Sequence, residues 1–289
     1  MKWIILAGGS GTRLYPITKI ITKSLLPIYN KPMIYYPLST LMLSGIKDIL
    51  IISTPEDISK FEALLGNGSK YGIKLSYKTQ NKPEGIAQAF IIGKRFIGKD
   101  DVCLILGDNI FYGKELPKIL YDINKYVESN NESVIFGYNV KDPQRYGVIE
   151  FDHNKQIRSI IEKPNMPKSN YAVVGLYYYK NDVLDIVKNI KPSKRGELEI
   201  TDVNLEYLRQ NRLKATILDA VFWLDTGTHE TLTEASNFIK TIESRENKRV
   251  SCIEEIAYKY NYIDKETLKN NIRGYDNEYG RYLNRILND

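Results

Sequence analysis

The sequence predicts an α/β fold: a Rossmann-like, mostly parallel or mixed sheet flanked by helices, with a C-terminal helical subdomain. Continuous apolar runs at 2–6, 48–53 and 102–106 are typical of strands buried on both faces. Segments with apolar residues at helical spacing alternate with these runs, as in right-handed βαβ units. From residue 228 onward the chain is almost entirely compatible with helix.

The expected helices of the N-terminal half cover 33–44, 56–65 and 86–96, and a glycine follows each of them closely. A further helix is expected at 115–128. Strand-like runs then cluster at 134–138, 148–151, 157–161 and 172–179, which favours a mixed sheet or an appended β layer. A helix at 199–209 and a strand at 215–218 complete a predicted core of 1–230, whose halves meet near residue 110, and 231–289 forms the helical segment.

The composition is that of an ordinary globular protein. The chain has 289 residues, of which 43% are hydrophobic and 26% charged, so disorder, collagen and coiled coil are excluded as its main description. No apolar run approaches the roughly 20 residues of a membrane span, and the N-terminus lacks the features of a signal peptide. Two cysteines and two histidines make neither a disulfide framework nor a multi-histidine metal site. We therefore expect a cytoplasmic protein without a membrane segment.

The chain is mildly basic, with a formal net charge of +6 and a pI near 8.9. The excess is spread along the sequence and forms no block of the kind that binds nucleic acid. A solvated surface explains most of it, and a site for small polyanions such as phosphates is the other interpretation.

The loop after the first strand is rich in glycine. Gly8, Gly9 and Gly11 free the backbone from Cβ clashes, so successive N–H groups can point into one concavity that suits phosphate oxygens. Thr12 and Arg13 follow, and the arginine fork can bind a phosphate through two hydrogen bonds. Two familiar phosphate loops are excluded, because the Gly-Lys-Ser/Thr end of a P-loop is absent and Leu14 replaces the third glycine of the dinucleotide fingerprint. A tight turn without a ligand is the alternative.

This loop and its continuation resemble the signature of the sugar-nucleotide pyrophosphorylases. Further motifs along essentially the whole chain resemble the glucose-1-phosphate thymidylyltransferase branch of that family. The motifs are LAGGSGTRLYPIT at 6–18, KSLLP at 23–27, KPMIYYPL at 31–38, GDN at 107–109, RYGV at 145–148, EKP at 162–164, PKSNY at 167–171, RGELEITD at 195–202 and WLDTGT at 223–228.

The resemblance implies that dTTP and α-D-glucose 1-phosphate react to give dTDP-glucose and pyrophosphate, the first step of dTDP-L-rhamnose or other deoxysugar biosynthesis. It assigns the nucleotide to about 1–110 and the sugar to about 111–230. The nucleophile is a phosphate oxygen that is already ionised, so no general base is needed. Catalysis then depends on positioning and electrostatic stabilisation.

The same resemblance assigns Mg²⁺ to Asp108 and Asp225. Asp108 follows the strand at 102–106, at the end of the sheet where open α/β folds bind ligands, and Asp225 has a similar strand-end setting. Mg²⁺ typically takes one or two carboxylates together with substrate phosphates and water. Capping of turns or helices by these two aspartates is the alternative.

Family positions for the reacting phosphates fall on basic residues. Arg13 and Lys23 match those that bind the triphosphate, and Lys163 and Arg195 match those that hold the sugar phosphate. The alternative for Lys23 is a solvated surface lysine, and for Lys163 it is an exposed pair with glutamate that contributes little energy.

The remaining family positions concern the base and the sugar. Gln80 and Gly85 match the base site. The amide side chain of Gln80 can form hydrogen bonds with both the acceptor and the N–H donor on the edge of thymine. Uracil presents the same edge, so Gln80 does not distinguish dTTP from UTP. Residues that match positions around the sugar are Asn109, Tyr146, Gly147, Glu162 and Val173.

The match weakens at 217–222, which is acidic and apolar where relatives often carry a basic segment of a regulatory site. Residues 250–258 do resemble the family's regulatory and dimer region. We therefore expect a homo-oligomer, a tetramer by resemblance, with weakened feedback by dTDP-L-rhamnose. The alternatives left open are another nucleotide such as UTP, a non-catalytic homologue, and a nucleic-acid-binding protein suggested only by the pI.

Overall fold

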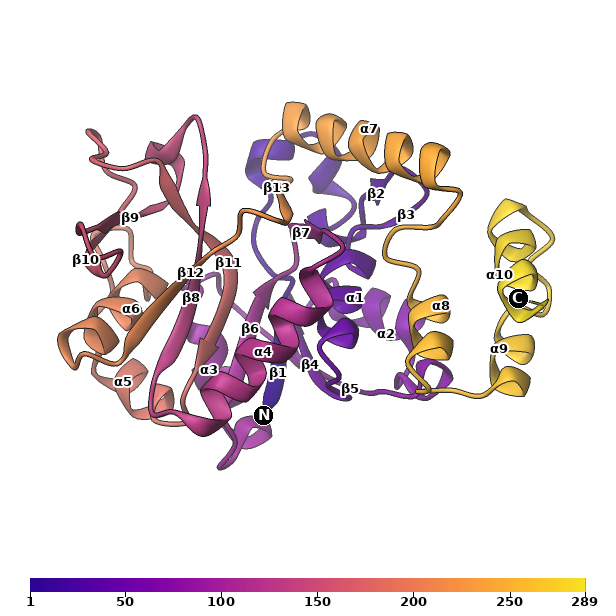
Figure 1. Ribbon diagram of the computed structural model, residues 1–289, viewed down its shortest axis with the longest axis horizontal. Coiled ribbons are helices and arrows are strands. Elements are labelled where there is room, and N and C mark those ends of the chain that lie inside the picture. The colour runs from indigo at the N-terminus through magenta and orange to yellow at the C-terminus, as the bar shows by residue number, and fades with distance from the viewer. Residues whose placement is uncertain (289) are drawn as a thin grey trace.

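The computed structural model describes residues 1–288, which form a nine-stranded mixed sheet with helices on both faces (Figure 1). Its strands follow the order β10-β9-β11-β6-β1-β4-β5, and β8 pairs with both β11 and β12. The strand bounds are β1 Lys2–Leu6, β4 Asp48–Ser53, β5 Lys74–Thr79, β6 Val102–Leu106, β8 Ser133–Asn139, β9 Gly147–Phe151, β10 Ile157–Glu162, β11 Tyr171–Tyr179 and β12 Leu213–Ile217.

Two layers of helices cover this sheet, and the predicted fold class is confirmed. Helices α3, α5 and α6 pack on one face, α1, α2 and α4 pack on the other, and α8 packs on α1 (Figure 1). The helix bounds are α1 Tyr35–Leu43, α2 Ile58–Leu65, α3 Gln88–Ile97, α4 Leu116–Ser129, α5 Val183–Asn189, α6 Ile200–Arg209, α7 His229–Glu246, α8 Ile253–Lys259, α9 Lys265–Asn271 and α10 Glu278–Asn288.

Strand β1 shows why the apolar run at its start predicts a central strand. It pairs in parallel with β4 on one side and β6 on the other. Trp3 and Ile5 face the layer that contains α1, whereas Ile4 and Leu6 face the layer that contains α3. Because successive side chains point to opposite faces, a strand covered on both faces must be apolar at every position.

The sheet changes from parallel to antiparallel at β11. The strands β5, β4, β1 and β6 are parallel, while β11 runs antiparallel to β6, β8 and β9. The halves expected on either side of residue 110 therefore share one continuous sheet. The mixed sheet was one of two arrangements that the strand cluster favours, and it is the one observed.

Two short ribbons stand apart from this sheet. One pairs β2 (Pro27–Ile28) with β3 (Lys31–Pro32), and the other pairs β7 (Asn109–Tyr112) with β13 (Phe222–Asp225). The sequence patterns do not indicate β7 or α5. β7 is only four residues long and begins with the polar Asn109, so no apolar period marks it as a separate strand.

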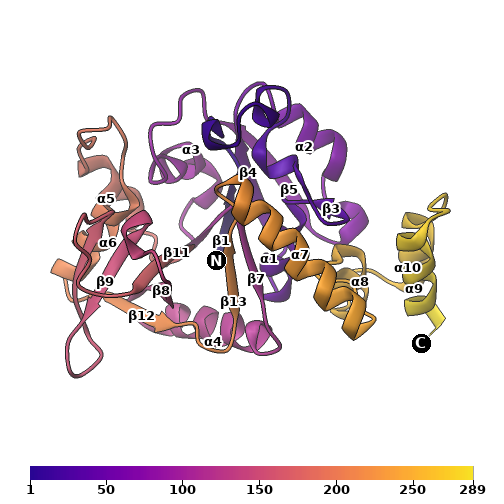
Figure 2. The ribbon, with the colours of Figure 1, turned by 90° about the horizontal axis from the view of Figure 1, so that it is seen from above.

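The C-terminal helices pack against the N-terminal part of the chain. Helix α7 buries Ala235 and Ile239 against Leu26, Ile28 and Met33, and α9 and α10 lie at the end of the molecule farthest from β9 (Figure 2). Helix α7 begins at His229, close to the expected start of the helical segment. Within residues 1–288, no helix has the length and apolar character needed to cross a bilayer.

Candidate active site

A long cleft runs beside the carboxyl ends of β1 and β6. It consists of a cavity of about 660 Å³ and a second one of about 340 Å³. The residues that line both cavities are Thr12, Arg13, Ile86, Leu106 and Asp108. Because these residues form a shared wall, the two cavities make one cleft with two lobes, which meet at an arginine and an aspartate.

The smaller lobe is formed by the glycine-rich loop. Gly9 has a φ of 118° and Gly11 a φ of 57°, backbone conformations that residues with a Cβ rarely adopt. Gly11 leads into a short 3-10 helix, Thr12–Leu14, in which Leu14 is fully buried and Arg13 is exposed. The buried leucine thus anchors the turn that presents the arginine to the cleft.

Asp108 and Asp225 come from distant parts of the chain and lie side by side. Asp108 directly precedes β7, Asp225 ends β13, and the ribbon register pairs Asp225 with Asn109. The backbone and hydroxyl of Thr226 both donate to the Asp108 carbonyl, at 3.3 and 2.9 Å. The predicted convergence of the two aspartates is therefore present in the structure.

The two carboxylates differ in their electrostatic environment. Burial raises the pKa of Asp225, and the negative charge of Asp108 raises it further. Burial alone would raise the pKa of Asp108 as well, but the Lys23 ammonium, whose Nζ lies 2.5 Å from Asp108 Oδ2, reverses the direction and lowers it. Lys23 therefore holds Asp108 in its charged form.

Asp225 has three further neighbours. Tyr146 donates its hydroxyl hydrogen to Asp225 Oδ2 at 3.4 Å, and Arg145 Nη2 lies 3.6 Å from the same oxygen. Arg145 Nη2 is buried and has no hydrogen-bond partner among residues 1–288. The third neighbour is Gly227, at which an added Cβ would lie 2.9 Å from Asp225 Oδ2 and 3.1 Å from Arg13 Nη1. A side chain at this position would push the carboxylate or the guanidinium aside.

Asn109 joins the aspartate to the sheet. Its Oδ1 accepts hydrogen bonds from Trp223 Nε1 at 2.6 Å and from the Gly175 amide at 3.0 Å. Its Nδ2 donates to Asp108 Oδ1 at 2.9 Å. Asn109 is buried, so these bonds fix its orientation and, through it, that of Asp108.

The larger lobe carries charges of both signs. Lys163 Nζ lies 3.4 Å from Glu162 Oε1, and Arg195 Nη2 lies 2.9 Å from Glu199 Oε1 and 3.7 Å from Glu162 Oε1. Thr201 donates to Glu162 Oε2 at 2.6 Å. Lys163 has a φ of 44°, which is uncommon for a residue with a side chain and often accompanies functional sites.

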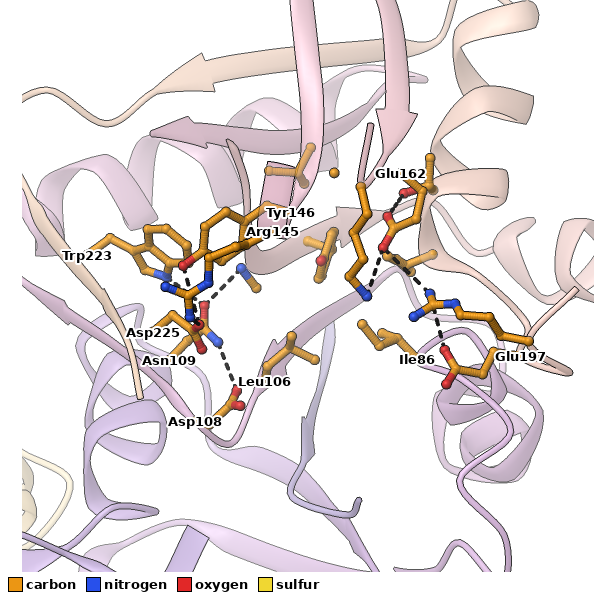
Figure 3. A pocket seen from close by; sticks show the side chains of 18 of the residues that line it. Ile86, Leu106, Asp108, Asn109, Arg145, Tyr146, Glu162, Glu197, Trp223 and Asp225 are labelled. Atoms are coloured by element: carbon orange, nitrogen blue, oxygen red, sulfur yellow. Dashed lines mark hydrogen bonds and ion pairs between the residues drawn. The ribbon is translucent and has the colours of Figure 1, made fainter. Parts of the chain in front are cut away.

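The two groups of side chains face each other across the lobe (Figure 3). Asp108, Asn109, Arg145, Tyr146, Trp223 and Asp225 gather on one side, and Glu162 and Glu197 stand on the other (Figure 3). Gly147 and Val173 line the same lobe.

Gln80 and Gly85 are not among the lining residues of either lobe. Gln80 follows β5 and is only 4% exposed, so it is not an exposed polar residue. Its Nε2 donates to the Gly85 carbonyl at 3.3 Å and to Gln88 Oε1 at 2.6 Å. The structure therefore places both residues in the wall next to the glycine-rich loop.

All other predicted site residues line the cleft. Among the lining residues to which sequence reasoning assigned no role are Arg145, Thr201, Trp223 and Gly227. Each stands inside a recognised motif, which is a signal that could have found them. Their partners are distant in the chain, so the motif alone does not indicate what they contact.

The donor set of the cleft is compatible with a hard divalent cation. Carboxylate oxygens are the ligands that Mg²⁺ prefers, and Asp108 and Asp225 supply them together. Within residues 1–288, three or more His, Cys, Asp or Glu side chains nowhere gather as a metal site. A cation held by this pair would therefore take its remaining ligands from substrate and water.

Comparison with known proteins gives a consistent result. Residues 2–242 match the family model described as nucleotidyl transferase. A glucose-1-phosphate thymidylyltransferase of Neisseria meningitidis is 53% identical over 289 residues, covering 99% of each chain. One of Mycobacterium tuberculosis is 51% identical, also over 99% of each chain.

Solved structures show the same relationship. A Bacillus anthracis protein named as a glucose-1-phosphate thymidylyltransferase, in complex with sucrose, superposes with a TM-score of 0.76 at 42% identity, covering 82% of this chain and 94% of that chain. A UDP-glucose pyrophosphorylase complexed with UDP-glucose has a TM-score of 0.73 at 29% identity, covering 83% and 98%.

Proposed function

The chain belongs to the nucleotidyl transferase family and, within it, to the glucose-1-phosphate thymidylyltransferases, and from that premise we propose how its cleft performs the reaction. The substrates are dTTP and α-D-glucose 1-phosphate, and the products are dTDP-glucose and pyrophosphate. The observation that carries the proposal is the two-lobed cleft whose lobes meet at Arg13 and Asp108. Two anionic substrates held in the two lobes would react at that junction.

The nucleotide occupies the smaller lobe in this proposal. The triphosphate lies on the backbone amides of Gly8, Gly9 and Gly11 and meets Thr12 and Arg13. Lys23, which in this structure is paired with Asp108, is close enough to the same lobe to contact a phosphate. Gln80 and Gly85 lie in the wall beside this lobe, joined by a hydrogen bond, and are the residues proposed to receive the base there.

Glucose 1-phosphate occupies the larger lobe. Lys163 and Arg195 hold its phosphate, and Glu162 accepts hydrogen bonds from sugar hydroxyls. Further contacts with the sugar come from Asn109, Tyr146, Gly147 and Val173, all of which line that lobe.

The chemical step needs positioning and charge compensation. A phosphate oxygen of the sugar phosphate forms a bond to the α-phosphorus of dTTP, and the bond from that phosphorus to the bridging oxygen breaks as pyrophosphate leaves. Arg13 and Lys23 stabilise the negative charge that develops on the leaving group. Arg145 and Tyr146 keep the Asp225 carboxylate oriented from the other side.

Asp108 and Asp225 fit a Mg²⁺ ion, because they are adjacent, partly buried and rich in anionic oxygen. When bound, the ion would reduce the repulsion between the two anionic substrates. Lys23 would then release Asp108 and become available to phosphate.

Pyrophosphate release from the purified chain tests this function. We expect turnover with dTTP and glucose 1-phosphate in the presence of Mg²⁺ and a slower reaction with UTP. Asp225→Asn should lower turnover by several orders of magnitude without unfolding the protein. Asp185→Asn, on the exposed side chain of another aspartate, is the matched control and should be neutral. Faster turnover with UTP would support the UDP-glucose relatives' activity instead, and no release with any nucleotide would support a non-catalytic homologue.

The proposal also includes a cytoplasmic homotetramer that is inhibited by dTDP-L-rhamnose. In support, Val250 and Ser251 of the expected regulatory segment line a cavity of about 150 Å³ beside α7. Phe222, in the altered segment, is 52% exposed and packs on Phe238, as an interface aromatic would. Native mass measurement and kinetics with added dTDP-L-rhamnose test these two points.

A further inference from the structure

Two loops from opposite lobes of the cleft are joined by their backbones. The loop at 80–87 follows β5 beside the glycine-rich loop, and Leu198 lies in the loop that carries Arg195 into α6. The Leu198 amide donates to the Glu84 carbonyl at 2.7 Å, and the Ala87 amide donates to the Leu198 carbonyl at 3.2 Å. These bonds join two segments that are far apart in the sequence, as a pair of β-strands would.

Gly85 makes this approach feasible. It has a φ of 104°, and an added Cβ would lie 2.3 Å from the Leu198 carbonyl oxygen and 2.6 Å from the Leu198 nitrogen. Real Cβ atoms essentially never come so close to backbone atoms, so a side chain at this position must force the loops apart. The close approach of Leu198 therefore explains why position 85 is occupied by glycine, independently of any contact between Gly85 and a base.

The first loop is also tied to the glycine-rich loop. Gln80 donates to the Gly85 carbonyl at 3.3 Å, and its Oε1 would lie 2.9 Å from a Cβ placed on Gly8. Gln80 is thus packed between Gly8 and Gly85. A bound nucleotide that restricts the movement of Gly8 and Gln80 should therefore also restrict the movement of Gly85.

The second loop is held together around Arg195 by internal hydrogen bonds. The Ser193 amide donates to the Glu197 carbonyl at 2.9 Å, and the Ser193 hydroxyl donates to Glu199 Oε1 at 2.7 Å. Arg195 Nη2 contacts both carboxylate oxygens of Glu199 at 2.9 Å. Because these bonds close the loop on itself, we expect a displacement of Leu198 to displace Arg195.

We infer that the pairing of Glu84–Ala87 with Leu198 couples the two substrate sites, so that a nucleotide in the smaller lobe positions Arg195 for the sugar phosphate. The inference rests on the proposed function. In it, Gly85 and Leu198 are positioning residues. Since a binding coupling is reciprocal, glucose 1-phosphate must also tighten nucleotide binding by the same factor.

Calorimetric titration measures this coupling directly. Glucose 1-phosphate is titrated into the enzyme with Mg²⁺, with and without α,β-methylene-dTTP, an analogue whose α–β bridge cannot be cleaved. In the wild type we expect the analogue to tighten glucose 1-phosphate binding at least about fivefold, the lower end of measured couplings. In Gly85→Ala, the analogue is added at concentrations that saturate its site. It should then tighten glucose 1-phosphate binding by less than about twofold. Equal factors in both proteins overturn the inference.

Hydrogen exchange supplies a measurement that needs no variant. The analogue alone should slow amide exchange in a peptide covering 193–199 as well as in one covering 8–13. If the analogue slows amide exchange in 8–13 but not in 193–199, the coupling is overturned, whereas the assignment of the nucleotide to the smaller lobe is supported. Protection of neither segment means that the nucleotide does not bind, which overturns the proposed function and the coupling with it.

Discussion

Replacing Asn109 with alanine tests how Asp108 is held in place. Asn109 is 3% exposed, so water has little access to the groups that it satisfies. The substitution leaves the Trp223 indole N–H and the Gly175 amide without their acceptor, and it removes the hydrogen bond to Asp108 Oδ1. All three losses follow from a single side chain.

The magnitude follows from these bonds. A buried donor left unsatisfied costs about 1–3 kcal/mol, so two of them should lower the free energy of unfolding by about 2–6 kcal/mol. A hydrogen bond to a charged group contributes about 1.5–3 kcal/mol. If the alignment of Asp108 is required in the transition state, losing it should reduce kcat by about 10- to 150-fold.

Urea denaturation and steady-state kinetics measure the two effects separately. Asn237→Ala, on the exposed surface of α7, is the matched control and should change neither. A variant of Asn109 that is as stable as the wild type and differs only in a raised KM for glucose 1-phosphate would refute the reasoning. It would mean that the amide serves the sugar and does not position Asp108.

Three further predictions concern single positions. Gly227→Ala places a Cβ 2.9 Å from Asp225 Oδ2, so pyrophosphate release should fall at least about tenfold with an unchanged melting temperature; wild-type rates would contradict this crowding. Burial raises the pKa of Glu254 in the folded state. At pH values between the unfolded-state pKa and the folded-state pKa, the folded protein therefore binds more protons than the unfolded chain, and its stability falls as the pH rises. Glu254→Gln should therefore be more stable than the wild type at pH 8 in urea titrations, and a gain that persists near pH 4 would disprove this cause. Glu243→Gln leaves the buried ammonium of Lys31 and the guanidinium of Arg249 without their shared carboxylate partner, at 2.9 and 2.7 Å, which should cost about 3–5 kcal/mol in the free energy of unfolding; adding Lys31→Met should recover only the part of that loss that comes from Lys31.

Much of the fold can be predicted from local patterns. The apolar runs of β1, β4 and β6 indicate buried strands because burial on both faces requires an apolar side chain at every position. The helices between them follow from their apolar spacing, and Gly66 and Gly98 stand directly after α2 and α3 as predicted. Each of these patterns lies within a short stretch of sequence, so it can be recognised without knowledge of the tertiary structure.

The short ribbon of β7 and β13 cannot be predicted in this way. Its strands are four residues each and more than a hundred residues apart, so no local period marks their pairing. Yet this register brings Asp225 beside Asn109 and so beside Asp108. The sequence motifs indicate that both aspartates belong to the site, and the pairing of β7 with β13 brings them together.

By itself, the sequence determined the fold class, the glycine-rich loop with Arg13, and the residue types available for phosphate and metal chemistry, because each depends on neighbours along the chain. Only the tertiary structure decided that Arg145 faces Asp225, that Trp223 donates a hydrogen bond to Asn109, and that Gly85 lies against Leu198. Each of these contacts joins segments from different strands or loops. Strand register and loop packing determine such distances, and neither can be read from a local pattern.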